Sequence, residues 1–200
     1  MGQPEASGRR RPGRRRDELE PPSAGAAAMD REPDAEEVAR TIALRQLTAA
    51  PRSRAQLEAA LAKRDVPEDV AARVLDRFTE VGLVDDTAYA EMLVRTRHAE
   101  RGLARRALAA ELHKKGIDPE VAGAALAQVD DADEEAAARR LVEKKTRSTA
   151  GLDRQVRRRR LAAMLARKGF GPGVAMRVVD EVLAAEGEDP GADRADWSLD

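Results

Sequence analysis

One short pattern occurs three times in the sequence. Residues 61–70 read LAKRDVPEDV, residues 112–121 read LHKKGIDPEV and residues 165–174 read LARKGFGPGV, so the copies lie 51 and 53 residues apart. Each copy holds an apolar residue, a basic pair, a break and a new start ending in Val. A period of this size is typical of repeat proteins, whose units bury their apolar faces against one another. The pattern therefore predicts tandem structural units.

Each copy predicts two amphipathic helices joined by a tight turn. In the second copy Gly116 is expected to end one helix, Asp118 to cap the next and Pro119 to occupy its first turn. Ile117 and its counterpart Phe170 are expected to anchor the turn on the core. The apolar positions recur at helical spacing. Those expected in the core are Leu57, Leu61, Leu108, Leu112, Leu161 and Leu165 on the first helices, and Val70, Leu75, Phe78, Val121, Leu126, Val129, Val174, Val179 and Val182 on the second.

A further helix is expected before each pair, at about 34–49, 86–99 and 133–146. Comparable inward positions there are Val38 and Ile42, Tyr89 and Leu93, and Ala137 and Leu141. Repeat one departs from the others, because Asp65 replaces the turn glycine and Pro67 comes one place early, so its turn is expected to differ.

The predicted fold is all-α, an elongated right-angled array of three tandem three-helix repeats flanked by disordered tails. Ala, Leu, Arg and Glu dominate and aromatic residues are only 2% of the chain, which favours helices with a thin aliphatic core. The expected segments are an Arg-rich arm at 1–33, repeats at 34–84, 85–130 and 131–185, and an acidic tail at 186–200.

Several classes of protein are disfavoured by composition. The chain has no cysteine, which excludes disulfides, thiol catalysis and cysteine metal sites. No stretch approaches the roughly 18–20 apolar residues of a membrane helix. The Arg-rich start has no apolar stretch behind it, unlike a secretory signal. We therefore expect a cytoplasmic protein with no membrane partner.

Catalytic and metal-binding groups are sparse. His98 and His113 have no ligand partner at helical spacing, so no metal and no cofactor is expected. Asp85 and Asp86 form a carboxylate pair that would suit acid–base chemistry, but such pairs more often cap the following helix. The sequence shows no nucleophile beside a base and no phosphate-binding loop, so the prediction is not an enzyme.

Charge is the remaining functional signal. Residues 144–160, KKTRSTAGLDRQVRRRR, hold eight basic residues and one acid, and four arginines stand together at 157–160. One interpretation is an anionic partner, either nucleic acid phosphate or an acidic protein surface; the other is a solvated polar face. Positive charge at a helix start opposes the helix dipole, which favours the partner. Lys114 and Lys115 are explained equally well by the dipole at a helix end.

The ordered motifs resemble those of the RecX family of regulatory proteins. They are GLVDDTAYA at 82–90, RTRHAERGLARRALAAELHKKGID at 95–118 and RRRRLAAMLARKGFG at 157–171, and the resemblance covers about 36–185. It implies a modulator of the RecA recombinase that binds along the groove of the RecA filament on single-stranded DNA. It also implies reduced RecA ATPase, filament extension and strand exchange, with no catalysis by the regulator itself.

Because of this resemblance, the basic residues of repeats two and three are candidates for contact with RecA or DNA. A monomer is expected, and DNA is a further candidate partner through its phosphates, single- or double-stranded; about five such contacts would give a log–log salt slope near −4 to −5. The candidate RecA- or DNA-binding residues are Arg101, Arg105, Arg106, Lys114, Lys115, Arg157, Arg158, Arg159, Arg160, Arg167 and Lys168.

Two other functions remain open at this point. A helix-turn-helix DNA-binding regulator would use the second helix of each pair to read bases, but VAARVLDRF, VAGAALAQV and VAMRVVDEV are poor in Arg, Asn and Gln. A passive helical scaffold for another protein is the third candidate.

Overall fold

The computed structural model describes residues 34–187 of the 200-residue chain. Within that range the regular structure is helical, with no strand. The predicted arm at 1–33 and residues 188–200 of the predicted tail lie outside the described residues. The helices are α1 (Ala35–Ala49), α2 (Arg54–Ala62), α3 (Glu68–Glu80), α4 (Asp86–Arg101), α5 (Arg105–Lys114), α6 (Pro119–Leu126), α7 (Asp131–Thr146), the 3-10 turn η2 (Arg147–Thr149), α8 (Arg154–Arg167) and α9 (Pro172–Gly187).

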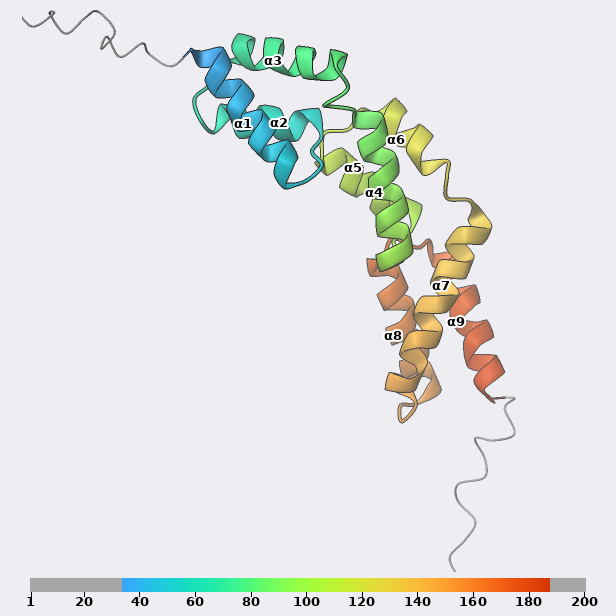
Figure 1. The fold of residues 1–200 in the computed structure, drawn as a ribbon. Helices are drawn as coiled ribbons and strands as arrows, with labels where there is room; N and C mark the ends of the chain where they lie inside the picture. The colour runs from blue at the N-terminus through green and yellow to red at the C-terminus, as the bar shows by residue number, and fades with distance from the viewer. Residues whose placement is uncertain (1–33, 188–200) are drawn as a thin grey trace, which may run out of the picture. The chain divides into compact units, whose positions relative to one another are not determined.

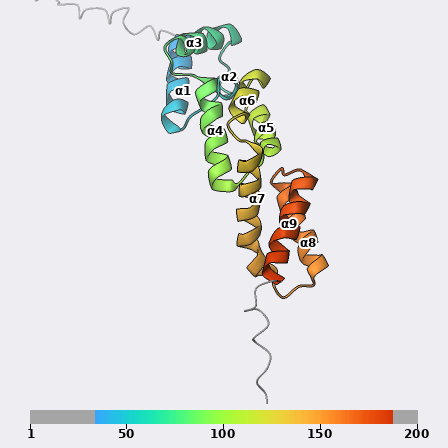
Figure 2. The same cartoon turned by 90° about the vertical axis from the view of Figure 1, so that its right-hand side faces the viewer.

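The helices group in threes, α1–α3, α4–α6 and α7–α9 (Figures 1 and 2). Each helix packs chiefly against the other two of its own group. Every group has its own cluster of buried apolar side chains. The predicted all-α class and the three tandem three-helix repeats are therefore confirmed.

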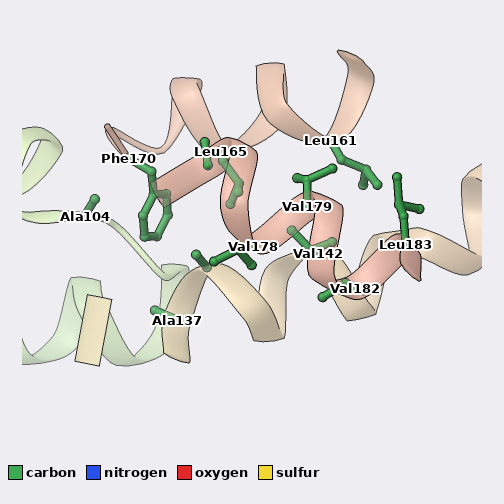
Figure 3. Close-up of a cluster of buried hydrophobic side chains, with 12 residues drawn as sticks. Ala104, Ala137, Val142, Leu161, Leu165, Phe170, Val178, Val179, Val182 and Leu183 are labelled. Carbon is green, nitrogen blue, oxygen red and sulfur yellow. The ribbon is translucent and has the colours of Figure 1, made fainter. Parts of the chain in front are cut away.

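The predicted leucines lie at the centre of these clusters. Leu57, Leu61, Leu108, Leu112, Leu161 and Leu165 are all buried, and so are the turn anchors Ile117 and Phe170. Figure 3 shows the third cluster, where Phe170 lies on the side toward Ala104 of repeat two. On the second helices Val121, Leu126 and Val174 are only partly buried, whereas the other six predicted positions are buried.

The first helix of each repeat buries a stripe centred one residue later than predicted. The fully buried positions are Ala39 and Ala43 in α1, Ala90 and Val94 in α4, and Ala138 and Val142 in α7, each with 0% exposure. Val38, Ile42, Tyr89 and Leu141 are only partly buried beside them, while Leu93 and Ala137 are buried. Small side chains at these positions let the first helix approach the other two closely, and the larger neighbours fill the edges of the contact.

The turn between second and third helices has one conformation in all three repeats. Gly116 and Gly169 are left-handed, with φ of 71° and 92°, and Asp65 occupies the same region with φ of 56°. The next residue donates its N–H to the carbonyl five residues back in each case, at 3.3 Å from Val66 to Leu61 and 3.2 Å in the other two repeats. The expectation of a different turn in repeat one is therefore wrong. What differs is the helix cap, because Pro67 precedes α3 and offers no side-chain cap, whereas Asp118 caps α6.

The turn glycines are needed because the preceding repeat packs against them. A Cβ on Gly169 would lie 2.6 Å from the backbone nitrogen of Ala107 in α5, and one on Gly116 would overlap the Cβ of Ala55 in α2. Asp65 is exposed, and the described residues hold no repeat before the first. An aspartate is tolerated there because only the backbone conformation, and no neighbour, constrains the side chain.

Asp65→Gly is expected to stabilise the protein by about 1 kcal/mol, because a left-handed backbone is strained for most side chains and not for glycine. Urea unfolding followed by circular dichroism measures the change. A variant less stable than the parent would show that the Asp65 side chain stabilises the turn by more than its backbone strain costs.

Candidate partner-binding surface

Acidic side chains join successive repeats. The Asp86 Oδ1 accepts from the backbone N–H of Arg54 at 2.8 Å, and Glu134 Oε1 accepts from the N–H of Arg105 at 2.8 Å. In both cases the first helix of one repeat caps the second helix of the repeat before it. Asp85 caps its own helix α4 by accepting from Ala88 N–H at 2.9 Å. The carboxylate pair is thus structural, and its two members cap helices in different repeats.

Each junction also contains a hydrogen bond to the backbone carbonyl of one lysine. The Ser53 hydroxyl donates to the carbonyl of Lys115 at 2.6 Å, and the Ala104 N–H donates to the carbonyl of Lys168 at 3.0 Å. The Lys168 ammonium in turn donates to the carbonyl of Arg101 at 2.6 Å. Lys168 is therefore occupied within the protein, whereas the half-buried Lys115 joins the repeats through its backbone alone.

One arginine recurs at the aligned position in the second helix of every repeat, as the first residue of α2 and α5 and the fifth of α8, and it is always ion-paired. Arg54 contacts Asp76 at 2.7 Å, Arg105 contacts Glu134 at 3.4 Å and also Asp131, and Arg158 forms a bidentate pair with Asp180 at 2.5 and 2.8 Å. Hydrogen bonding from Arg158 lowers the pKa of Asp180. Arg105 and Arg158 were predicted as partner contacts, but their charges are already matched inside the protein.

Arg157 is also engaged internally. Its guanidinium pairs with Glu186 and donates to the Thr149 hydroxyl at 3.3 Å and to the Thr146 carbonyl at 3.5 Å. Glu186 belongs to α9, which runs two residues beyond the predicted end of repeat three. Acidic side chains on α9 therefore stabilise the arginine-rich first half of α8 by pairing with Arg157 and Arg158. This pairing was not apparent from the sequence.

The Arg157 pair should make stability depend on pH. Burial alone would raise the pKa of Glu186, but hydrogen bonds from Arg157 and Thr146 and the charge of Arg157 bring that pKa below the ordinary carboxyl value of 4.5. Because the pKa of Glu186 is lower in the folded protein, the ionised side chain stabilises the fold above about pH 4.5. This stabilisation is lost as the pH falls through the pKa of Glu186 in the folded protein.

Glu186→Gln is therefore expected to lower the free energy of unfolding by about 0.2–1 kcal/mol at neutral pH, a difference that should be smaller at pH 3. Urea titrations at both pH values measure it. Glu143→Gln is the control, because Glu143 is exposed and forms no ion pair with any residue of 34–187. An equal loss at both pH values would assign the effect to packing instead of charge.

The remaining predicted cations point to solvent without a partner. Arg101, Arg106, Lys114, Arg159, Arg160 and Arg167 are exposed, and their side chains form no ion pair or hydrogen bond with the described residues. Arg106 and Lys114 recur 53 residues later as Arg159 and Arg167. We call these four residues the recurrent cations. They present the same charges on equivalent helices of repeats two and three.

Prediction from sequence missed further cations in the same part of the chain. Four of them are exposed and form no ion pair or hydrogen bond within residues 34–187: Arg140, Lys144 and Lys145 on α7 and Arg147 on η2. The fifth, Arg154 at the start of α8, is also exposed, and its charge helps to lower the pKa of Asp180. Four of the five lie in the basic run at 144–160. The run was recognised in the sequence, but only the four arginines at 157–160 were chosen from it as candidate contacts.

The surface offers charge but little other chemistry. Across the described ranges, no group of three or more His, Cys, Asp and Glu side chains is arranged to hold a metal ion. His98 Nδ1 lies 3.0 Å from the carbonyl of Leu103, where it supports the end of α4. None of the helices in the part of the chain that the structure describes has the length and apolar character needed to cross a membrane. The arrangement therefore suits the binding of an anionic surface.

Comparison with known proteins identifies the family. Models of the first, second and third three-helix domains of RecX match residues 39–78, 85–126 and 133–179 in that order. The chain belongs to the RecX family. The domains of the family models coincide with the α1–α3, α4–α6 and α7–α9 groups, and the resemblance seen in the sequence motifs is confirmed.

Similar relatives extend across most of the chain. The regulatory protein RecX of Streptomyces coelicolor is 54% identical over 156 residues, which are 78% of this chain and 83% of that protein. The regulatory protein RecX of Thermobifida fusca is 51% identical over 176 residues, 88% of this chain and 94% of that protein. These relatives carry the name of a regulator, which agrees with the expectation of a regulatory protein.

Solved structures share the RecX fold. The crystal structure of RecX from Lactobacillus salivarius has a TM-score of 0.68 and 24% identity, covering 76% of this chain and 98% of that one. At that identity the comparison concerns the fold, and it places the helical repeats within a known architecture.

Proposed function

We propose that this chain binds the RecA recombinase and its nucleoprotein filament and inhibits ATPase activity, filament extension and strand exchange. It would thereby modulate DNA repair and recombination, acting as a cytoplasmic monomer without catalysis of its own. The observation that carries the proposal is the match of three RecX domains in order. The recurrent cations support it, because they give an array of repeats several equivalent places to contact one repetitive partner.

Repetition on both sides suits a filament. The recurrent cations provide equivalent charged positions on α5 and α8, and a filament of identical subunits presents the same surface on each successive subunit. Each exposed charge contributes little alone, but contacts linked by one scaffold raise the overall affinity by effective concentration. A regulator bound across more than one subunit in the filament groove would impede addition at the growing end or promote loss of subunits.

DNA phosphates are a second source of negative charge within the same filament. Binding through phosphates would show a steep salt dependence and little preference for sequence. Aromatic residues are 2% of the chain, so stacking on single-stranded bases has few side chains to use. We propose that any contact with DNA is made by the exposed cations.

A duplex-reading regulator is a weaker proposal because, within the described residues, the second helix of each pair lacks unpaired basic side chains. Arg73 and Arg77 on α3 pair with Asp69 and Glu80, and Arg177 on α9 pairs with Glu135 at 2.5 Å. Helix α6 carries no basic residue. These helices offer no unpaired arginine to a base edge.

The test is the DNA-dependent ATPase of the cognate RecA on single-stranded DNA, titrated with this protein, with filament length measured in parallel by electron microscopy. We expect inhibition well below one molecule per RecA subunit, together with shorter filaments, because control at the level of the filament is substoichiometric. Unchanged ATPase and filament length with equimolar protein, shown to be folded by circular dichroism, would overturn the proposal.

A further inference from the structure

The end of α9 lies beside the end of α7. Glu186 pairs with Arg157, and the same guanidinium donates to the Thr146 carbonyl and the Thr149 hydroxyl. Thr146 is the last residue of α7, and Arg147 to Thr149 form η2. Residue 188 therefore follows directly from a point that is held against the last turn of α7.

The C-terminal half of α7 and the first residue of η2 carry an unmatched cationic stripe. Arg140, Lys144 and Arg147 stand at i, i+4 and i+7, which places them on one face of the helix over about 10 Å. They and the neighbouring Lys145 are exposed and unpaired within residues 34–187, and Glu143 is the one acid among them. The opposite face holds the buried Ala138 and Val142. The stripe thus presents an excess of three positive charges.

The segment that follows α9 has the complementary charge. Residues 188–200, EDPGADRADWSLD, contain five acids and one arginine, a side-chain charge of −4. Thirteen residues span about 40 Å when extended, so the segment can run the length of the stripe from its attachment at Gly187. A tethered acidic segment has a high effective concentration at a site this close to its anchor.

We propose that residues 188–200 bind the cationic stripe Arg140–Lys144–Arg147 of their own chain and compete there with anionic partners. The stripe is then an anion-binding site that is masked by the C-terminal segment and opened when a stronger anionic surface displaces it. The Arg157–Glu186 pair holds the end of α9, where the segment begins, beside the end of α7. This inference goes beyond the proposed function and requires no RecA.

Paramagnetic relaxation in the full chain tests the contact directly. The sequence has no cysteine, so Ser198→Cys carries a single nitroxide label. We expect the label to broaden the backbone amide signals of residues 140–147 at low salt, and high salt or Arg140→Ala/Lys144→Ala/Arg147→Ala to abolish the broadening. Lys63→Ala/Arg64→Ala is the matched control, since these exposed cations of repeat one also lack partners; it should leave the broadening intact.

Heparin affinity chromatography tests the competition. Removal of residues 188–200 should raise the salt concentration needed for elution, and the same truncation in the triple-alanine background should produce little change. An equal increase in the eluting salt concentration in the parent and triple-alanine backgrounds would assign the effect to net charge. That result would overturn the stripe as the binding site. Absence of broadening at 140–147, or broadening of similar size around Lys63, would overturn the contact itself.

Discussion

Gly169→Ala is expected to lower the free energy of unfolding by about 2–4 kcal/mol. The left-handed conformation, with φ of 92°, costs an alanine about 1–2 kcal/mol, and overpacking at a close contact adds about 1–3 kcal/mol. The added methyl would lie 2.6 Å from the backbone nitrogen and 2.7 Å from the Cβ of Ala107. The backbone of α5 cannot move away without breaking the adjacent bond from Ala104 N–H to the Lys168 carbonyl.

The matched control is Gly173→Ala, in the first turn of α9. Its added Cβ has no neighbour within 4 Å and its backbone is not left-handed, so stability should stay the same or rise slightly through helix propensity. Urea unfolding of both variants measures the contrast. Equal stability of the two variants would show that repeats two and three do not pack closely at this turn.

The four consecutive arginines are expected to divide into a functional pair and a structural pair. Arg159→Ala/Arg160→Ala removes exposed cations that have no partner among residues 34–187, so stability should change by less than about 0.5 kcal/mol. Inhibition of the RecA ATPase should weaken about tenfold, the equivalent of losing about 1.4 kcal/mol of binding free energy.

Arg157→Ala/Arg158→Ala should behave in the opposite way. These side chains hold α8 against Glu186 and Asp180 of α9, so their loss should lower stability and leave the half-inhibitory concentration nearly unchanged where both variants are folded. Titrations of ATPase inhibition beside urea unfolding separate the two effects. If the Arg157/Arg158 variant loses inhibition at full folding while the Arg159/Arg160 variant keeps it, the assignment of the exposed pair to the partner contact is wrong.

Much of the fold was predictable because the periodic pattern is strong. The leucines at i and i+4, the turn glycines and the Asp118–Pro119 cap are local features, and the structure confirms their roles. The register of the first helices was missed by one residue, since burial there centres on alanines such as Ala39 and Ala90, which a search for large apolar side chains overlooks.

The candidate surface was less predictable, because ion pairing depends on contacts that are distant in sequence. Nothing local distinguishes Arg158, which pairs with Asp180, from Arg159, which has no partner in the part of the chain that the structure describes. Arg105 pairs with acids 26 and 29 residues away, and the cap of Arg54 N–H by Asp86 spans 32 residues. Local pattern identifies where charge gathers, but three-dimensional packing decides which charges remain available.

The junctions between repeats affect which substitutions the protein can tolerate on its surface. Lys115 joins repeats one and two through its carbonyl, which accepts from Ser53, so the joint does not depend on which side chain stands at that position. A substitution there changes surface charge while the hydrogen bond persists. Surface charge at this position is thus separable from assembly of the scaffold, because substitution of the side chain leaves the joint between the repeats in place.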